Sequence, residues 1–150
     1  MTSYPDTSYL CALYRFQENS ERAASHFAGM EGSLVIASPL LFEFRQSIRL
    51  QAWLHTKDKG KGYSKQTAQH ALAMFQNNIS TGAIRIIPVD WPDVVGIAEA
   101  ISSEFTWTNG CRGFDILHVA TALHLGSSGF LTFDRNQKKL AQAKGLTVPF

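Results

Sequence analysis

The sequence predicts an α/β protein with a three-layer α/β/α arrangement, in which helices cover both faces of a mostly parallel central sheet of four to five strands. Short apolar segments such as residues 33–37 and 129–133 lack polar alternation, which is typical of strands buried in a parallel sheet. Longer segments with apolar residues at helical spacing separate them. The 150 residues are 45% hydrophobic and 17% charged, so we expect a single domain over residues 1–150 rather than a disordered chain.

The ends of the expected elements follow capping residues and chain breakers. In chain order, helices are expected over residues 7–16, 21–30, 39–56, 64–79, 90–105, 114–125 and 135–144, and strands just before Asp6 and over 33–37, 83–89, 129–133 and 146–148. Ser38 is a favourable N-cap and Pro39 is tolerated in a first turn, so this pair predicts the start of the third helix. Residues 57–62 are expected to form a polar turn and residues 106–113 a loop. The segment 114–125 is apolar nearly all round, which predicts a buried helix.

Composition excludes several classes of protein. No apolar stretch reaches the roughly 18 residues of a membrane span, because charged and polar residues such as Glu43 and His118 interrupt them. Residues 1–6 carry neither a basic region nor an apolar core, so we expect a cytoplasmic protein without a membrane partner. Cys11 and Cys111 are too few for a disulfide framework. The formal net charge of +2 neither demands nor excludes a polyanionic partner.

Four carboxylates follow strands or open helices in the predicted order. Asp6 follows the first short strand, Glu43 lies early in the helix after Ser38, Asp115 begins the apolar helix, and Asp134 follows the strand at 129–133. In open parallel sheets, ligands bind at the carboxyl ends of the strands. Carboxylates gathered there repel one another unless a cation neutralises them, and Mg²⁺ or Mn²⁺ takes oxygen ligands of this kind. The pattern therefore indicates a divalent metal site.

A purely structural role is the alternative for each acid taken singly. A carboxylate at a helix N-terminus is stabilised by free N–H groups and the helix dipole, by roughly 0.3–1 kcal/mol. Asp90, followed by Trp91 and Pro92, is interpreted as such a cap. Glu43 and Asp115 fit that explanation less well, because large apolar residues flank both, and a carboxylate in apolar surroundings is costly unless it is paired.

Four short motifs together resemble a known family. They are YPDTSYL at residues 4–10, SPLLFE at 38–43, RGFDILHVATAL at 112–123 and FLTFD at 130–134. In this order and spacing, over essentially the whole chain, they resemble the PIN domain, and among PIN domains the VapC-type toxin ribonucleases. Each motif alone is weak, whereas all four in order are specific. Pro5 departs from the usual apolar residue before the first Asp.

The resemblance implies an activity and a site. The activity is endoribonuclease hydrolysis of RNA phosphodiester bonds, dependent on Mg²⁺ or Mn²⁺. The acidic quartet matches Asp6, Glu43, Asp115 and Asp134, which we expect to be both metal ligands and catalytic residues, with Glu43 completing the site or orienting the water. Thr132 matches the accompanying hydroxyl, and Ser8 is expected behind the ligands. The family usually forms homodimers and is inhibited by a small antitoxin, so both partners are expected. The apolar residues of the helices within 39–79 are the expected partner surface.

RNA binding needs cations near these acids. The candidates are Arg45, Arg112, Arg135 and Lys138. The basic turn within residues 57–65 is more simply a solvated surface. His118, three residues after Asp115, could serve as a general acid, although a packed structural histidine is the simpler interpretation.

Other functions remain in competition with the nuclease. A phosphorelay receiver would need an acidic pair near the first strand, and a haloacid-dehalogenase-type phosphatase would need an acid where Ser8 stands. The alternative that stays open is a catalytically weak PIN-like module that acts by binding RNA or a partner protein.

Overall fold

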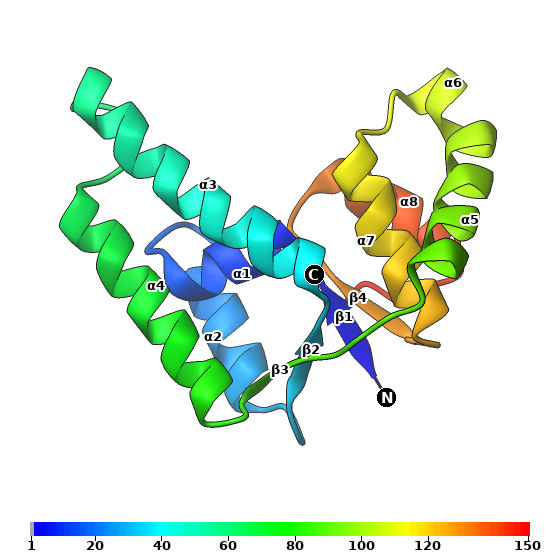
Figure 1. The fold of residues 1–150 in the computed structure, drawn as a ribbon, viewed down its shortest axis with the longest axis horizontal. Coiled ribbons are helices and arrows are strands. Elements are labelled where there is room, and N and C mark those ends of the chain that lie inside the picture. The colour runs from blue at the N-terminus through cyan, green and yellow to red at the C-terminus, as the bar shows by residue number, and fades with distance from the viewer. Residues whose placement is uncertain (1) are drawn as a thin grey trace. The chain divides into compact units, whose positions relative to one another are not determined.

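The structure, a computed structural model, describes residues 2–150 and confirms the α/β class with parallel strands. The helices are α1 (Thr7–Tyr14), α2 (Ser20–Ala28), α3 (Ser38–Lys57), α4 (Lys65–Ser80), α5 (Trp91–Ile101), α6 (Trp107–Asn109), α7 (Gly113–His124) and α8 (Arg135–Ala143), with a π-helical segment, Ser102–Thr106, between α5 and α6 (Figure 1). The strands are β1 (Ser3–Pro5), β2 (Leu34–Ile36), β3 (Ile84–Ile86) and β4 (Gly129–Leu131). Within the described chain, no helix combines the length and the apolar character needed to cross a membrane.

The chain divides into two compact units. The first, here called the terminal unit, contains the residues up to Tyr9 together with Ile87–Phe150. The second, here called the middle unit, is Leu10–Ile86. Each unit contains one pair of parallel strands, β1 with β4 and β2 with β3. The expected single domain over residues 1–150 stays a prediction, and each unit is described by itself.

The terminal unit is built on β1, β4 and α7. Tyr4 of β1 pairs in parallel register with Phe130 of β4, and both side chains are buried. The Asp6 N–H donates to the Leu131 carbonyl over 3.0 Å, which extends this pairing one residue beyond β1. Helix α7 contacts both strands and also packs on α5 and α8. Val119 and its neighbours in α7 are fully buried, as the all-round apolar pattern predicts.

The middle unit packs α3 against α4 (Figure 1). Phe44 of α3 and Phe75 of α4 are fully buried, with ring centroids 4.6 Å apart, and the Tyr14 ring contacts both. Aromatic pairs at this distance stabilise a core beyond the area they bury. Leu34 of β2 pairs with Ile84 of β3, and α4 contacts β3.

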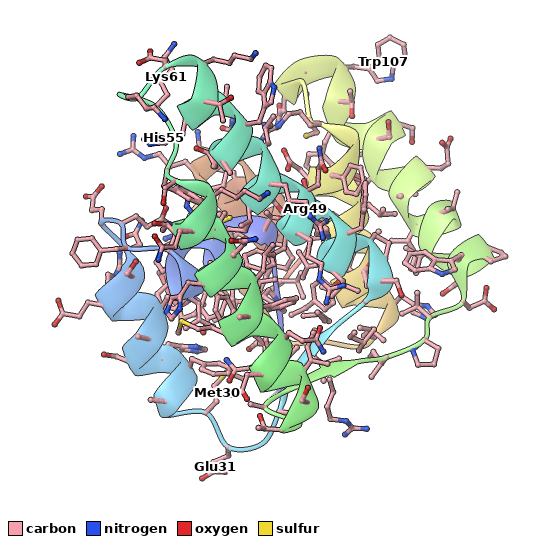
Figure 2. The ribbon with its side chains drawn as sticks, turned by 60° about the vertical axis from the view of Figure 1, so that its left-hand side comes forward. Met30, Glu31, Arg49, His55, Lys61 and Trp107 are labelled. Atoms are coloured by element: carbon pink, nitrogen blue, oxygen red, sulfur yellow. The ribbon has the colours of Figure 1, made fainter. Side chains whose placement is uncertain are left out.

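The structure corrects several predicted boundaries. Residues 106–113 are not all loop, because Trp107–Asn109 forms α6 and Gly110, with φ of 60°, ends it in the left-handed conformation. Figure 2 shows the Trp107 side chain pointing away from the ribbon, and it is 89% exposed. Ser38 is the first residue of α3 and does not cap it, since Ala37 stands at the N-cap. The strand expected over 146–148 is a single bridge between Thr147 and Gly129.

Candidate active site

Asp6 is buried at the junction between β1 and α1. Its side chain caps α1, because Oδ1 accepts a hydrogen bond of 2.9 Å from the Tyr9 N–H. The Ser8 hydroxyl donates to the same oxygen over 2.7 Å, and the Thr132 hydroxyl donates to Oδ2 over 2.5 Å. Although the residue is 0% exposed, three donors therefore satisfy the carboxylate, and Oδ2 still has a lone pair to offer.

Ser8 and Thr132 connect Asp6 to the segment that follows β4. Thr132 Oγ1 accepts from the Asp134 N–H over 3.0 Å, and Ser8 Oγ accepts from the Phe133 N–H over 2.9 Å. Each hydroxyl has one proton, and each gives that proton to Asp6. The two hydroxyls therefore fix the carboxylate and the backbone of residues 133 and 134 relative to one another.

Burial raises the pKa of Asp6 to about 6, because removing the carboxylate from water penalises its charged form. The hydrogen bonds from Ser8, Thr132 and the Tyr9 N–H act in the opposite direction, and so does the charge of His118. The carboxyl group is therefore partly protonated just below neutral pH. A cation beside Oδ2 would favour the ionised form.

Asp134 caps α8. Its Oδ1 accepts from the Asn136 and Gln137 N–H groups over 2.8 Å and 2.9 Å, so this oxygen is committed to the helix. Its Oδ2 lies 3.9 Å from Nη2 of Arg112, and the side chain is 31% exposed. One oxygen thus holds the helix while the other is available to a cation.

Asp115, in the first turn of α7, is paired with the same arginine. Nε of Arg112 donates to Oδ2 of Asp115 over 2.9 Å, and the Asp115 side chain is only 14% exposed. Arg112 is the N-cap residue of α7, but its side chain does not cap the helix. The guanidinium instead neutralises two carboxylates, those of Asp115 and Asp134. The two acids therefore converge on one cationic group.

This convergence bears on the predicted metal. The available donors are carboxylate oxygens, which are the ligands that Mg²⁺ and Mn²⁺ prefer. Among residues 2–150, however, no three His, Cys, Asp or Glu side chains stand close enough together to hold an ion. Arg112 already supplies a positive charge to Asp115 and Asp134, as an ion would. The residues fit a divalent cation in chemistry, and holding one requires the carboxylates to come closer together as well as the guanidinium to move.

The other predicted residues are placed as follows. Glu43 is partly buried in α3 and belongs to the middle unit, so its place in an acidic quartet stays a prediction. Arg45 donates to Oε1 of Gln76 over 2.7 Å and so ties α3 to α4. Arg135 is exposed at the start of α8, whereas the Lys138 ammonium donates to the Phe150 carbonyl.

His118 is 1% exposed and its ring centroid lies 6.0 Å from that of Phe114. This burial agrees with the interpretation of a packed histidine, which affects Asp6 through its charge.

Sequence reasoning missed a polar cleft of about 420 Å³ beside Asp115. It lies between the segment leading into α7 and the first turns of α8. Its walls include Asn109, Cys111, Arg112, Asp115, Gln137 and Lys139. Of these wall residues, only Arg112 and Asp115 were among the expected site residues. The others could have been found only by their proximity in sequence to Asp115 and Asp134.

The fold is α/β with parallel strands, as expected from the sequence motifs. Asp6 and Asp134 follow strands and cap helices, and Asp115 lies in the first turn of α7. The sequence model of the PIN domain family matches residues 3–143. The chain therefore belongs to the PIN domain family. Comparison with curated protein sequences gives no match.

Solved structures share the fold at low identity. VapC20 from Mycobacterium tuberculosis, a sarcin–ricin loop cleaving toxin, is 15% identical over 97% of both chains, with a TM-score of 0.65. FitAcB from Neisseria gonorrhoeae is 18% identical over 98% of this chain and 96% of that chain, with a TM-score of 0.65. VapBC2 from Rickettsia felis, bound to a DNA fragment from its promoter, is 16% identical over 99% of this chain and 97% of that chain, also at 0.65.

Proposed function

We propose that this PIN domain is an endoribonuclease that hydrolyses RNA phosphodiester bonds with Mg²⁺ or Mn²⁺, as the toxin of a toxin–antitoxin pair. One observation carries the proposal. Asp6, Asp115 and Asp134 belong to one continuous set of contacts, in which Thr132 connects Asp6 to Asp134 and Arg112 connects Asp134 to Asp115. Each acid also has a structural partner, but Asp6 and Asp134 each keep one oxygen outside their helix caps, and such oxygens suit a cation.

The roles follow from the contacts. When bound, a divalent cation supplies charge neutralisation at the scissile phosphate and a lowered pKa for the attacking water. Asp6, Asp115 and Asp134 would hold it, each through an oxygen that is not committed to a helix cap. Thr132 and Ser8 keep the Asp6 carboxylate in place by donating to it. Glu43 would complete the ligand set or orient the water.

Arg112 has two roles in this proposal. Without RNA it neutralises Asp115 and Asp134. Its side chain is 74% exposed, so the guanidinium can leave the acids without unpacking a core. A phosphate of the substrate then offers it a new bidentate partner. Arg135 would bind RNA from the start of the neighbouring helix, and Arg45 and Lys138 would contribute only after giving up their present partners.

The toxin role draws support from the neighbours, because one of them is a sarcin–ricin loop cleaving toxin. An antitoxin and a second copy of the chain are the expected protein partners. The face formed by α3 and α4 is available to one of them. It carries the exposed apolar side chain of Trp53, which lines a groove of about 470 Å³ together with Ala52 and Leu72. Sedimentation at micromolar concentration tests the homodimer, and a monomer there would refute it.

The deciding experiment is a calorimetric titration of Mn²⁺ into the wild type and into Asp115→Asn, beside an RNA cleavage assay with and without EDTA. The proposal expects binding and cleavage by the wild type and loss of both in the variant. Glu99→Gln is the matched control, because Glu99 is an exposed acid on α5 of the same unit. Absence of Mn²⁺ binding and of cleavage, with RNA still bound, would favour the alternative of a binding module.

A further inference from the structure

Two exposed aromatic residues flank Arg112 in the segment from Trp107 to Phe114, here called the aromatic segment. Trp107 is 89% exposed and its side chain points away from the ribbon (Figure 2), and Phe114 is 40% exposed. Large aromatic rings left in water cost free energy that a ligand covering them recovers. The packing of the terminal unit does not explain their exposure, so both rings are available to a ligand.

The chain that carries Trp107 is fixed, although the ring itself is uncovered. The π-helical segment Ser102–Thr106 connects α5 directly to α6, so Trp107 lies at the end of one continuous helical stretch. The Lys144 ammonium donates to Oε2 of Glu104 over 3.0 Å and lies 5.5 Å from the centre of the Phe105 ring. These contacts hold the end of the helical stretch and neutralise its nearest acid. A ligand therefore meets a ring on a fixed support.

The aromatic segment leads directly to one of the proposed metal ligands. Helix α6 ends at Asn109 and α7 begins at Gly113, and a link of this length spans at most about 14 Å. Phe114 immediately precedes Asp115 in the first turn of α7, and Arg112 donates to Asp115. An RNA strand that is cut at Asp115 therefore has its neighbouring nucleotides within reach of the aromatic segment.

The pattern of side chains favours RNA over a protein partner. Between the two rings stand Thr108, Asn109 and Arg112, all exposed and polar, so the apolar surface is interrupted. A protein interface has a continuous apolar core inside a polar rim. Proteins that bind single-stranded nucleic acid instead combine cations with separate aromatic rings on which bases stack. The aromatic segment has the second pattern.

Charge supports the same choice. Arg112 carries the only charge within residues 105–114, and its side chain is 74% exposed. Glu104, the acid that comes just before this stretch, is already paired with Lys144. The surface that presents the two rings is therefore cationic, which suits the phosphates of a nucleic acid.

We propose that Trp107 and Phe114 each stack on a base of single-stranded RNA, while Arg112 binds a phosphate of the same strand. This inference rests on the proposed function, since it takes that RNA to be the substrate of the acidic site. The two rings hold the strand on one side of the bond that is cut. Every base has a π-face, so stacking supplies affinity and position rather than a choice of base.

The test titrates the whole chain with an oligouridylate of about ten nucleotides, in buffer with EDTA so that no bond is cut. Tryptophan fluorescence reports the contact, because a base stacked on the exposed Trp107 indole quenches its emission. We expect oligouridylate to quench the wild type. A ribose–phosphate oligomer of the same length without bases should not quench it, and neither should an RNA duplex, whose bases are already stacked.

Two variants remove the rings one at a time. Trp107→Leu and Phe114→Leu each keep an apolar side chain, and each should weaken the binding of oligouridylate about tenfold. Quenching should be lost in Trp107→Leu and kept in Phe114→Leu. The oligomer without bases should bind both variants and the wild type alike. Phe16→Leu is the matched control, because Phe16 is a fully exposed aromatic residue of the middle unit, and it should change neither affinity nor quenching.

Several results would overturn the inference. They are unchanged RNA affinity in a folded Trp107→Leu, equal affinity of the wild type for the oligomer without bases, and absence of quenching. If Phe114→Leu does not fold, Trp107→Leu decides alone, because so exposed a side chain does not support the core. Loss of self-association in Trp107→Leu, with RNA binding unchanged, would assign the ring to a protein interface instead.

The failure of this inference differs from the failure of the proposed nuclease. Quenching by RNA and weaker RNA binding in both variants, in a protein that neither binds Mn²⁺ nor cuts RNA, would refute the nuclease and leave the aromatic segment as an RNA-binding surface. Cleavage with an unchanged KM in Trp107→Leu and Phe114→Leu would overturn the inference and leave the nuclease standing.

Discussion

Arg112 and Asp115, three residues apart at the start of α7, are joined by a hydrogen bond of 2.9 Å from Nε to Oδ2. The same guanidinium reaches toward Asp134, so one arginine serves two acids from two helices. The arginine side chain is mostly exposed, whereas the Asp115 side chain is mostly buried. The acid is therefore the fixed member of the pair and the arginine the one that can move. A cation that takes the arginine's place must compete with it.

This competition predicts that removing the arginine strengthens metal binding. Arg112→Gln leaves Asp115 and Asp134 without their positive partner, so we expect Mn²⁺ to bind more tightly, by about tenfold at most. RNA binding should weaken in the same variant, because a phosphate contact is lost. Calorimetry with Mn²⁺ alone measures the first effect, and RNA retention on a filter measures the second.

Arg135→Gln is the control for this prediction. Arg135 is exposed at the start of α8, and none of the ion pairs described above connects it to an acid. Its loss should weaken RNA binding and leave the Mn²⁺ affinity unchanged. Unaltered or weaker Mn²⁺ binding by a folded Arg112→Gln would mean that the arginine does not compete with the metal.

The buried carboxyl of Asp6 predicts a pH-dependent cost to stability in metal-free buffer. Its pKa is about 6 in the folded chain, against 3.8 in the unfolded chain. Between these values the folded state binds more protons, so stability falls as the pH rises through this window and stays lowered above it. The full cost is about 3 kcal/mol, from the conversion of pKa difference into free energy.

The variant Asp6→Asn tests the predicted direction of this change in stability with pH. The amide has the shape of the protonated acid and carries no charge, so the variant should be more stable than the wild type at pH 7.5. Near pH 4 the difference should be small, because the wild-type carboxyl is then mostly protonated when folded. Urea unfolding at the two pH values measures it. A variant less stable than the wild type at pH 7.5 would show that the hydrogen bonds accepted by the Asp6 carboxylate stabilise the fold more than the burial of its charge destabilises it. RNA cleavage should be lost in either case.

Thr132 is predicted to hold the pKa of Asp6 down, since its hydroxyl donates to Oδ2. Thr132→Val keeps the shape and removes the donor, so the pKa of Asp6 should rise above about 6. Stability should fall by about 1–3 kcal/mol, because a buried acceptor loses its partner. Carbon-13 NMR of the carboxyl group follows the titration directly.

Thr121→Val provides a matched comparison for that measurement. Thr121 is equally buried, but its hydroxyl donates to the Leu117 carbonyl within α7. The pKa of Asp6 should not change in this variant. If both valine variants shift the pKa of Asp6 alike, the effect arises from general loosening of the unit and not from the Thr132 hydroxyl.

The positions of Asp6 and Asp134 in the fold could be predicted from the sequence, whereas the contacts around them could not. Asp6 and Asp134 follow strands and cap helices, and both features depend on local spacing that is visible in the chain. The contact from Arg112 to Asp134 joins residues 22 positions apart on different helices, and no local pattern specifies it. The same holds for the unpaired oxygen of Gln137, which depends on how α8 packs.

Secondary structure could likewise be predicted where the sequence signal is local and strong, but not elsewhere. A buried helix over residues 114–125 was predicted from its apolar residues. Both predicted ends lie within one residue of the ends of α7, Gly113–His124. By contrast, α6 is only three residues long, too short for any periodicity to reveal. The strand predicted over 83–89 is confined to Ile84–Ile86, because Pro88 cannot donate to a neighbouring strand.

Manganese is predicted to reduce the pH-dependent loss of stability that Asp6 causes. A cation that binds the ionised carboxylate lowers its pKa, so the loss of stability between pH 4 and pH 6 should shrink when Mn²⁺ is present. Binding to the folded state alone also adds about 2.7 kcal/mol at one hundred times the dissociation constant. Thermal unfolding of the wild type with and without Mn²⁺, at pH 5 and pH 7.5, measures both effects. Asp6→Asn should gain less from Mn²⁺ than Glu99→Gln at both pH values. An equal gain would place the ion away from Asp6, and the proposed ligand set would lose its most deeply buried member.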